Sequence, residues 1–163
     1  MNSPSLFALS FAIFGMSTRV LVFAVDWESS VSTQLYFLFL LLAIFFGIRA
    51  FFIQKPESNF VQLFKVGARS SALYSLAVTG FTYIFYKFFD PNYFLGQIAT
   101  RLDEAQSKGY SAEEIERFTA NMEIVFSLST HIPTTLIGFT LLGMSYSVIV
   151  AFIFRKVPMM RKA

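Results

Sequence analysis

The sequence predicts an all-α membrane protein: four transmembrane helices, with an amphipathic helical hairpin between the third and the fourth, in a single domain over residues 1–163. Three observations predict this fold. The chain is 55% hydrophobic and only 14% charged, whereas soluble domains carry about 25% charged residues. Four stretches are long and apolar enough to cross a bilayer. The charges are also sorted, because most basic residues flank one set of stretch ends and most acids flank the other.

A helix needs about 20 apolar residues to cross the hydrocarbon core. The stretches that meet this length are Leu6–Val25, Thr33–Ile53, Val66–Phe89 and Ile132–Phe154. Pro133 predicts a bend or a fresh helix start at the beginning of the last span. Aromatic residues typical of an outer membrane interface flank the two acidic connections; they are Trp27, Tyr36, Tyr83, Tyr86 and Tyr93.

The long connection 90–130 predicts two helices. Asp90 is expected to cap the first and Pro91 to occupy its first position. Gly109 ends that helix, and Ser111 with Glu114 forms a Ser-x-x-Glu capping box that starts the second. Apolar stripes run along both helices and consist of Phe94, Ile98, Leu102 and Ala105, then Ile115, Phe118, Met122, Val125 and Phe126. The hairpin is expected either to pack on itself or to lie on the outer membrane surface.

Charge position predicts the topology, because basic residues in short loops are retained in the cytoplasm. The basic set is Arg49, Lys55, Lys65, Arg69, Arg155, Lys156, Arg161 and Lys162. The acidic set is Asp26, Glu28, Asp90, Asp103, Glu104, Glu113, Glu114, Glu116 and Glu123, while Glu57 lies with the basic residues. We therefore expect a multi-pass protein of the bacterial inner membrane with both termini in the cytoplasm. The first span lacks a basic flank and a cleavage site, so it is expected to remain as an anchor.

Small residues recur at helical spacing in the third and fourth spans, where they allow helix backbones to approach closely. The candidate helix-packing residues are Gly67, Ser71, Gly143, Ser147 and Ala151. Ser75 and Thr79 continue the row in the third span. This pattern has two interpretations, which are packing within the chain's own bundle and a seam toward a second copy or a partner protein.

Arg19 interrupts the first span, where a cation near the midplane costs roughly 2.5–3.5 kcal/mol on insertion scales. One interpretation is that its side chain extends to the outer interface beside Asp26, about 10 Å further along the helix. Alternatives are hydrogen bonds to nearby hydroxyls and a functional anion or lipid site. The candidate intramembrane polar site comprises Arg19, Ser75, Thr79 and Tyr83. The basic tail is expected to bind anionic headgroups through Arg155, Lys156, Arg161 and Lys162.

The sequence predicts no catalytic, cofactor-binding or metal-binding residue. It has no Cys and one His, and His131 is expected to cap a helix or lie at the interface. The acids Glu113, Glu114 and Glu116 indicate a solvated helix face rather than a cation site. A phosphate-binding glycine loop and a Ser-His-Asp set are absent from the sequence. Nucleic-acid binding is not expected, because the basic residues adjoin apolar spans.

The chain resembles a family of small four-helix inner-membrane proteins of Bacteroidota, the domain of unknown function DUF4199. The segments that carry the resemblance are GIRAFF at 47–52, FKVG at 64–67, YIFYKFFDPNY at 83–93 and GYSAEEIERF at 109–118. The resemblance covers nearly all of the chain after about residue 35. It implies a fold and a location, and it implies no catalytic residue, because the family has no established activity.

Taken together, these patterns predict a non-enzymatic accessory or assembly subunit of a larger membrane complex, without a cofactor. Its expected partners are membrane lipids and other membrane-protein subunits or further copies of itself. The alternative is a small oligomeric transporter or a lipid- or anion-binding membrane protein that uses Arg19 and the span hydroxyls. An intramembrane enzyme is a third and more distant possibility.

Overall fold

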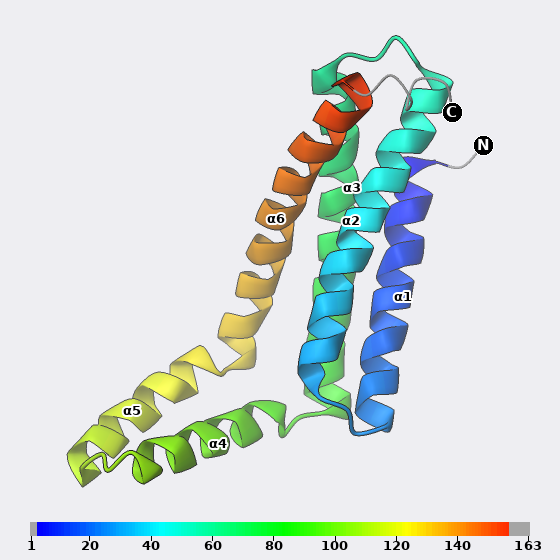
Figure 1. The fold of residues 1–163 in the computed structure, drawn as a ribbon. Coiled ribbons are helices and arrows are strands. Elements are labelled where there is room, and N and C mark those ends of the chain that lie inside the picture. Colours follow the sequence, from blue (N-terminus) through cyan, green and yellow to red (C-terminus); the bar gives the residue numbers. More distant parts are fainter. Residues whose placement is uncertain (1–2, 157–163) are drawn as a thin grey trace. The chain divides into compact units, whose positions relative to one another are not determined.

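A computed structural model describes residues 3–156, and in this part of the chain every regular element is a helix (Figure 1). The elements are α1 (Pro4–Ala24), α2 (Ser29–Gln54), α3 (Phe60–Ile84), the π-helix η1 (Phe85–Phe89), α4 (Tyr93–Ser107), α5 (Ala112–Val125) and α6 (Leu128–Lys156). Residues 3–156 contain no β-strand. The all-α fold class is therefore confirmed.

The chain divides into two compact units. The first comprises Met1–Val78 and Leu136–Ala163, and the second comprises Thr79–Thr135. The first unit therefore holds α1, α2, most of α3 and most of α6. The second holds η1, α4, α5 and the adjoining ends of α3 and α6.

Three helices are long and apolar enough to cross a membrane, judged by length and composition: α1, α2 and α6. The third predicted span, Val66–Phe89, falls on α3 and η1. Within the described residues, α3 is not among the three apolar helices, because Lys65, Arg69 and several hydroxyl side chains lower its mean hydropathy. Three of the described helices could thus span a membrane, and the fourth span stays a prediction.

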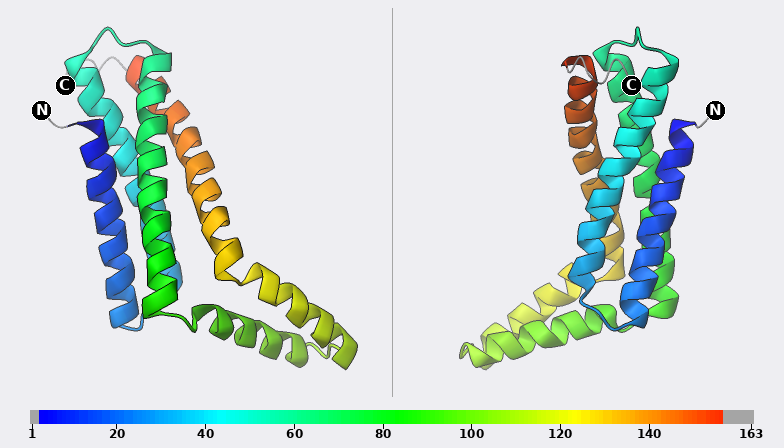
Figure 2. Two further views of the ribbon diagram at one scale, coloured as in Figure 1. Left: turned by 180° about the vertical axis from the view of Figure 1, so that it is seen from behind. Right: turned by 45° about the vertical axis from the view of Figure 1, so that its right-hand side comes forward.

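Within the first unit, α1 packs along α2, and both views in Figure 2 show α3 and the later part of α6 beside them. The buried side of α1 is made of residues four and three positions apart, which are Ala8, Ala12, Gly15, Arg19 and Val22. Most of them are small. A Cβ atom at Gly15 would lie 2.7 Å from the Tyr36 ring. The small side chains therefore bring the α1 backbone close to α2.

Tyr36 lies in the core of the first unit and not at an interface, so the expectation that it belongs to an outer aromatic belt is wrong. Only 7% of the residue is exposed. Its ring meets Phe139 edge-on at 6.0 Å between centroids, and its backbone carbonyl accepts a hydrogen bond from the Tyr74 hydroxyl at 2.8 Å. The physical reason is that Gly15 leaves room for the ring inside the bundle. Trp27, by contrast, is 67% exposed.

In the second unit α4 begins at Tyr93, so the prediction that Asp90 caps this helix and Pro91 starts it is wrong. Asp90 instead follows η1 as its C-cap, and its backbone N–H donates to the Phe85 carbonyl at 3.0 Å. This i→i+5 hydrogen bond is the pattern of a π-helix. Because Asp90 closes that turn, the next helix starts three residues later.

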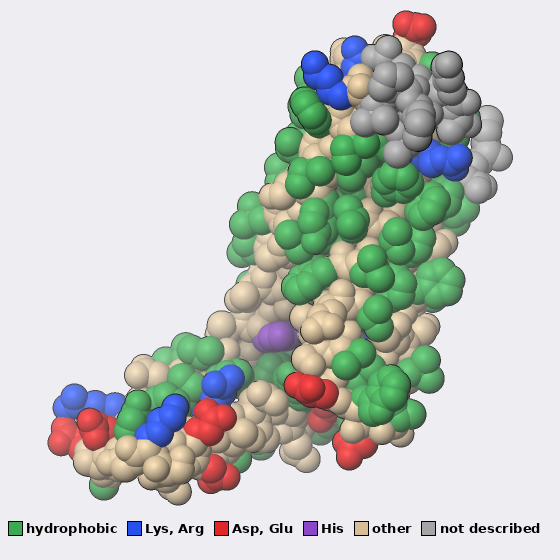
Figure 3. All heavy atoms as spheres, in the orientation of Figure 1, with side chains coloured by type: hydrophobic (Ala, Val, Ile, Leu, Met, Phe, Trp, Pro, Cys, Tyr) green, Lys and Arg blue, Asp and Glu red, His purple; other side chains and the backbone are tan. Residues whose placement is uncertain are grey.

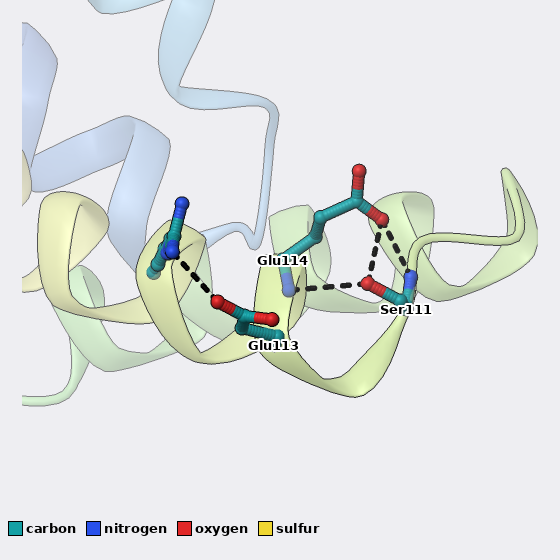
Figure 4. Close-up of polar contacts among 4 residues, drawn as sticks. Ser111, Glu113 and Glu114 are labelled. Atoms are coloured by element: carbon teal, nitrogen blue, oxygen red, sulfur yellow. Dashed lines mark hydrogen bonds and ion pairs between the residues drawn. The ribbon is translucent and has the colours of Figure 1, made fainter.

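The predicted capping box at the start of α5 is confirmed (Figure 4). The Ser111 backbone N–H donates to the Glu114 carboxylate at 2.8 Å, and the Glu114 N–H donates to the Ser111 hydroxyl at 3.4 Å. Gly109 in the preceding turn has φ +79°, a conformation that favours glycine. The two helices predicted in this connection are therefore present, and they contact each other. Their position relative to a membrane stays a prediction.

The last helix begins at Leu128 and runs through Pro133, so no new helix starts at this proline. The other alternative, a bend at Pro133, stays a prediction. The predicted span Ile132–Phe154 lies inside α6. Pro133 is the sixth residue of the helix. Near this end the missing N–H removes a single backbone hydrogen bond, which the long apolar helix accommodates.

Candidate functional site: the polar seam of the first unit

The small residues of α3 and α6 meet in pairs. A Cβ atom at Gly67 would lie 2.7 Å from the Ser147 hydroxyl and 2.8 Å from the Ser147 Cβ. A Cβ atom at Gly143 would lie 2.6 Å from the Ser71 Cβ and still closer to the Ser71 hydroxyl. Such distances are too short for a side chain, so only glycine fits at both positions. Each helix thus supplies one glycine and one serine to a reciprocal contact.

These contacts use the candidate helix-packing residues within the chain. Ser71, Ser147 and Ala151 are fully buried, at 0% exposure. The Ser147 hydroxyl donates to the Gly143 carbonyl at 2.7 Å, which satisfies that hydroxyl without a second helix. The structure therefore places four of the candidates, Gly67, Ser71, Gly143 and Ser147, in the packing of α3 against α6, and it buries the fifth, Ala151. It does not leave them as a seam for another chain.

Arg19 lies on the buried side of α1, and only 5% of the residue is exposed. It follows Gly15 by four residues, one helical turn, on the side of α1 that faces Tyr36 and Tyr74. A side chain extended to solvent beside Asp26 would be exposed. Arg19 is therefore not exposed to solvent beside Asp26 in the part of the chain that the structure describes, and the direction of its guanidinium stays a prediction.

Like Arg19 on α1, several hydroxyl groups of α3 are buried. Ser75 is 0% exposed and Thr79 is 5% exposed, and neither hydroxyl has a hydrogen-bond partner among the described residues. The hydroxyls of Ser70 and Ser71 are in the same state. A buried hydroxyl without a partner costs about 1–3 kcal/mol, so four on one helix are an unusual concentration. Buried hydroxyls without a hydrogen-bond partner mark either a site where a polar ligand binds or a tight contact between helices.

Tyr83, the fourth member of the candidate polar site, does not share this burial. It is 41% exposed, and its hydroxyl accepts a hydrogen bond from the Lys87 ammonium at 2.9 Å. Thr79 and Tyr83 belong to the second unit. The structure therefore brings Arg19 and Ser75 into the buried side of the first unit and leaves Tyr83 on a surface.

The candidate headgroup-binding residues are partly described. Arg155 donates from Nη1 to the Ser58 backbone carbonyl at 3.3 Å and so ties the end of α6 to the loop before α3. Lys156 is exposed, and Arg161 and Lys162 lie outside the described residues. Figure 3 shows Lys and Arg side chains gathered at this end of the first unit.

His131 lies in an aromatic cluster of the second unit. Its ring is 5.5 Å from that of Tyr86 and 5.4 Å from that of Phe94, both edge-on or strongly tilted. Tyr86 in turn stacks on Tyr93 at 4.6 Å. Between residues 3 and 156, no group of three His, Asp or Glu residues could hold a metal ion. Apart from its aromatic residues, no pattern in the sequence indicated this cluster, because Tyr86 lies in the π-helix η1, which no local pattern predicts.

A family model described as "Protein of unknown function (DUF4199)" matches residues 6–156. No curated protein and no solved structure matches the chain.

Proposed function

Because the chain belongs to the DUF4199 family of proteins of unknown function, we propose its role from its surfaces. We propose a non-enzymatic accessory or assembly subunit of a larger complex in the bacterial inner membrane. In this proposal α3 is the fourth span, both termini are cytoplasmic, and the helices α4 and α5 lie outside. The sorted charges support this orientation, because Lys and Arg residues surround the loop between α2 and α3.

The observation that carries the proposal is the surface of α5. None of the residues of this helix is buried, although it is amphipathic and carries large apolar side chains. Ile124 is 67% exposed and Val125 is 53% exposed. The same helix carries exposed charged residues, among them Glu113 and Arg117, which pair at 2.6 Å. Large exposed apolar side chains on a helix that also carries exposed charges are typical of a surface that another protein covers.

The small residues of α3 and α6 support the same proposal, because they already pack within the chain. Since Gly67, Ser71, Gly143 and Ser147 pack against one another, self-association through this seam would need the bundle to open. The contact with a partner is therefore expected at α5.

A crosslinking experiment tests this proposal, because the chain has no Cys and accepts single-Cys probes. Ile124→Cys on α5 is the probe. Leu76→Cys on α3 is the matched control, since Leu76 is 63% exposed and is expected to face lipid. In native membranes we expect one discrete, larger adduct from position 124, identified by mass spectrometry as a membrane protein, and none from position 76. Adducts with lipid alone at both positions would contradict the proposal.

A transporter or an anion-binding protein is the second candidate. It is favoured by the burial of Arg19 together with the unpartnered hydroxyls of Ser71 and Ser75. Ser71→Cys and Ser75→Cys variants discriminate it through labelling with a membrane-impermeant maleimide. Labelling of both would indicate a water-filled path through the first unit, whereas protection of both supports dry packing and the accessory role.

A further inference from the structure

Exposed apolar side chains flank a lysine where α3 passes into η1. Ile84, Phe88 and Phe89 are each at least 50% exposed, and they lie on either side of Lys87 in the sequence. All of them belong to the second unit. Neighbouring exposed apolar groups of this size mark a surface that something other than water covers. Together with Tyr83 they are called the η1 surface below.

The Lys87 ammonium is held among aromatic groups. Its Nζ donates a hydrogen bond to the Tyr83 hydroxyl at 2.9 Å. The same atom lies 5.2 Å from the centre of the Tyr83 ring and 5.5 Å from that of the Phe88 ring, within the range of about 6 Å for cation–π attraction. In the described part of the chain no carboxylate pairs with it. The positive charge of the η1 surface is therefore held in position and is not neutralised.

Lys87 and Tyr83 present two hydrogen-bond donors side by side. The ammonium has three N–H donors, of which the Tyr83 hydroxyl occupies one. Because that hydroxyl accepts from Lys87, its own hydrogen points elsewhere, and it has no acceptor between residues 3 and 156. Donors 2.9 Å apart can reach two oxygens of one phosphate group. A phosphate would therefore satisfy both donors and the charge at once.

The apolar part of the η1 surface identifies the source of the phosphate. A soluble phosphate would leave the Phe88 and Phe89 rings in water, whereas a bilayer interface offers phosphate oxygens and acyl carbons together. The position along the chain agrees with this source. A helix covers the distance from position 69 to position 87 in about 27 Å, and the hydrocarbon core is about 30 Å thick. With Arg69 at the inner interface, Lys87 thus reaches the outer one.

The charges of α5 separate its exposed surface from the η1 surface. The exposed residues of α5 include the acids Glu113, Glu114, Glu116 and Glu123. Carboxylates repel lipid phosphate, whereas the η1 surface offers it an ammonium. The bilayer is therefore expected at η1, and α5 stays available to a protein.

We propose that the η1 surface binds a phospholipid of the outer leaflet. Lys87 and Tyr83 hold the phosphate oxygens, and Ile84, Phe88 and Phe89 contact the first acyl carbons. The site rests on the proposed function in one respect, which is that α3 is the fourth span. It goes beyond the accessory role, because it requires no protein partner.

The first experiment locates η1 against the bilayer. Trp27 is the only tryptophan of the chain, so Phe88→Trp in a Trp27→Phe background places one fluorophore on η1. Ile124→Trp in the same background is the matched control, because Ile124 and Phe88 are both 67% exposed. The full-length protein is reconstituted into phosphatidylglycerol vesicles, and its emission is quenched with brominated phospholipid or with acrylamide in the water.

We expect brominated phospholipid to quench Phe88→Trp and acrylamide to quench Ile124→Trp. Equal quenching by acrylamide at both positions would overturn the lipid surface. Quenching of both by brominated phospholipid would support lipid at η1 and contradict a free α5, so the failure of this inference and the failure of the accessory role are distinguishable.

The second experiment titrates phosphatidylglycerol onto the purified protein in detergent, followed by native mass spectrometry. Lys87→Gln removes the charge, and Tyr83→Phe removes only the hydroxyl. Lys108→Gln is the matched control, since Lys108 is exposed in the same unit and follows the last residue of α4. We expect binding to weaken about fivefold in Lys87→Gln and about threefold in Tyr83→Phe, but less than about twofold in Lys108→Gln.

Equal weakening in Lys87→Gln and Lys108→Gln would show diffuse surface attraction and would overturn the site. Wild-type binding by both Lys87→Gln and Tyr83→Phe, two changes at exposed residues that are expected to fold, would do the same. Displacement of the lipid by millimolar inorganic phosphate, with Phe88→Trp open to acrylamide, would assign the two donors to a soluble anion and overturn the lipid.

Discussion

Substituting Gly143 by alanine perturbs the closest helix contact of the first unit. A Cβ atom there would stand 2.6 Å from the Ser71 Cβ, and neither backbone can move away easily because Ser71 is fully buried. Overpacking of this kind costs about 1–3 kcal/mol. Alanine offsets part of this, since it is favoured over glycine in a helix by about 0.8–1 kcal/mol. We expect Gly143→Ala to lower the free energy of unfolding by up to about 2 kcal/mol.

Gly138 supplies the matched control on the same helix. A Cβ atom at Gly138 meets nothing within 4 Å. Gly138→Ala should therefore gain the helix-propensity term alone, up to about 1 kcal/mol. A second variant, Ser71→Gly combined with Gly143→Ala, removes the colliding atoms and should recover at least 1 kcal/mol relative to additive behaviour.

The assay is reversible unfolding in mild detergent by titration with a denaturing detergent, followed by circular dichroism. The expected order of stability is Gly138→Ala above wild type and Gly143→Ala below it. If Gly143→Ala were as stable as Gly138→Ala, α3 and α6 would not approach each other at Ser71, and the internal use of the small residues would be refuted.

Three further predictions rest on single contacts. Tyr74→Phe removes the buried hydrogen bond to a backbone carbonyl of α2 and should lower the free energy of unfolding by about 1 kcal/mol, measured in the same titration; an unchanged midpoint would argue against that bond. Arg19→Cys should resist a water-soluble maleimide that labels Asp26→Cys, because Arg19 is 5% exposed; equal labelling would restore the interface interpretation. Hydrogen bonds from the backbone and side chain of Ser111 hold the pKa of Glu114 below its ordinary value, so this carboxylate stabilises α5 above the unfolded-state pKa. That contribution should be lost as the pH falls through the lower folded-state pKa, seen as faster amide exchange in α5, and Glu114→Gln should not show this dependence.

The sequence predicted the parts of the fold that depend on length, composition and local hydrogen bonds. Three apolar helices are present where about 20 apolar residues were found, and the capping box of Ser111 and Glu114 forms as its spacing indicates. The family resemblance is confirmed over residues 6–156. The apolar helices and the capping box can be predicted because each depends on the residues of a single segment of the chain.

The sequence could not predict features that depend on how helices approach one another. Tyr36 is an aromatic residue near an acidic loop, which is the pattern of a membrane interface. Gly15, on a different helix, makes room for its ring inside the bundle. The burial of Arg19 likewise depends on contacts between helices, which the sequence does not show. The start of α4 was misplaced because the π-turn of η1 already uses Asp90, and no local pattern distinguishes a π-turn from an α-turn.

The accessory role is tested most directly by the size of the complex that the tagged protein forms when it is extracted from native membranes in mild detergent. We expect a discrete complex with a larger membrane protein in fixed stoichiometry, and we expect an Ile124→Asp variant to fold normally but to run alone. If the wild-type protein itself ran alone or as a small homo-oligomer, the proposal that it is a subunit of a larger complex would be contradicted.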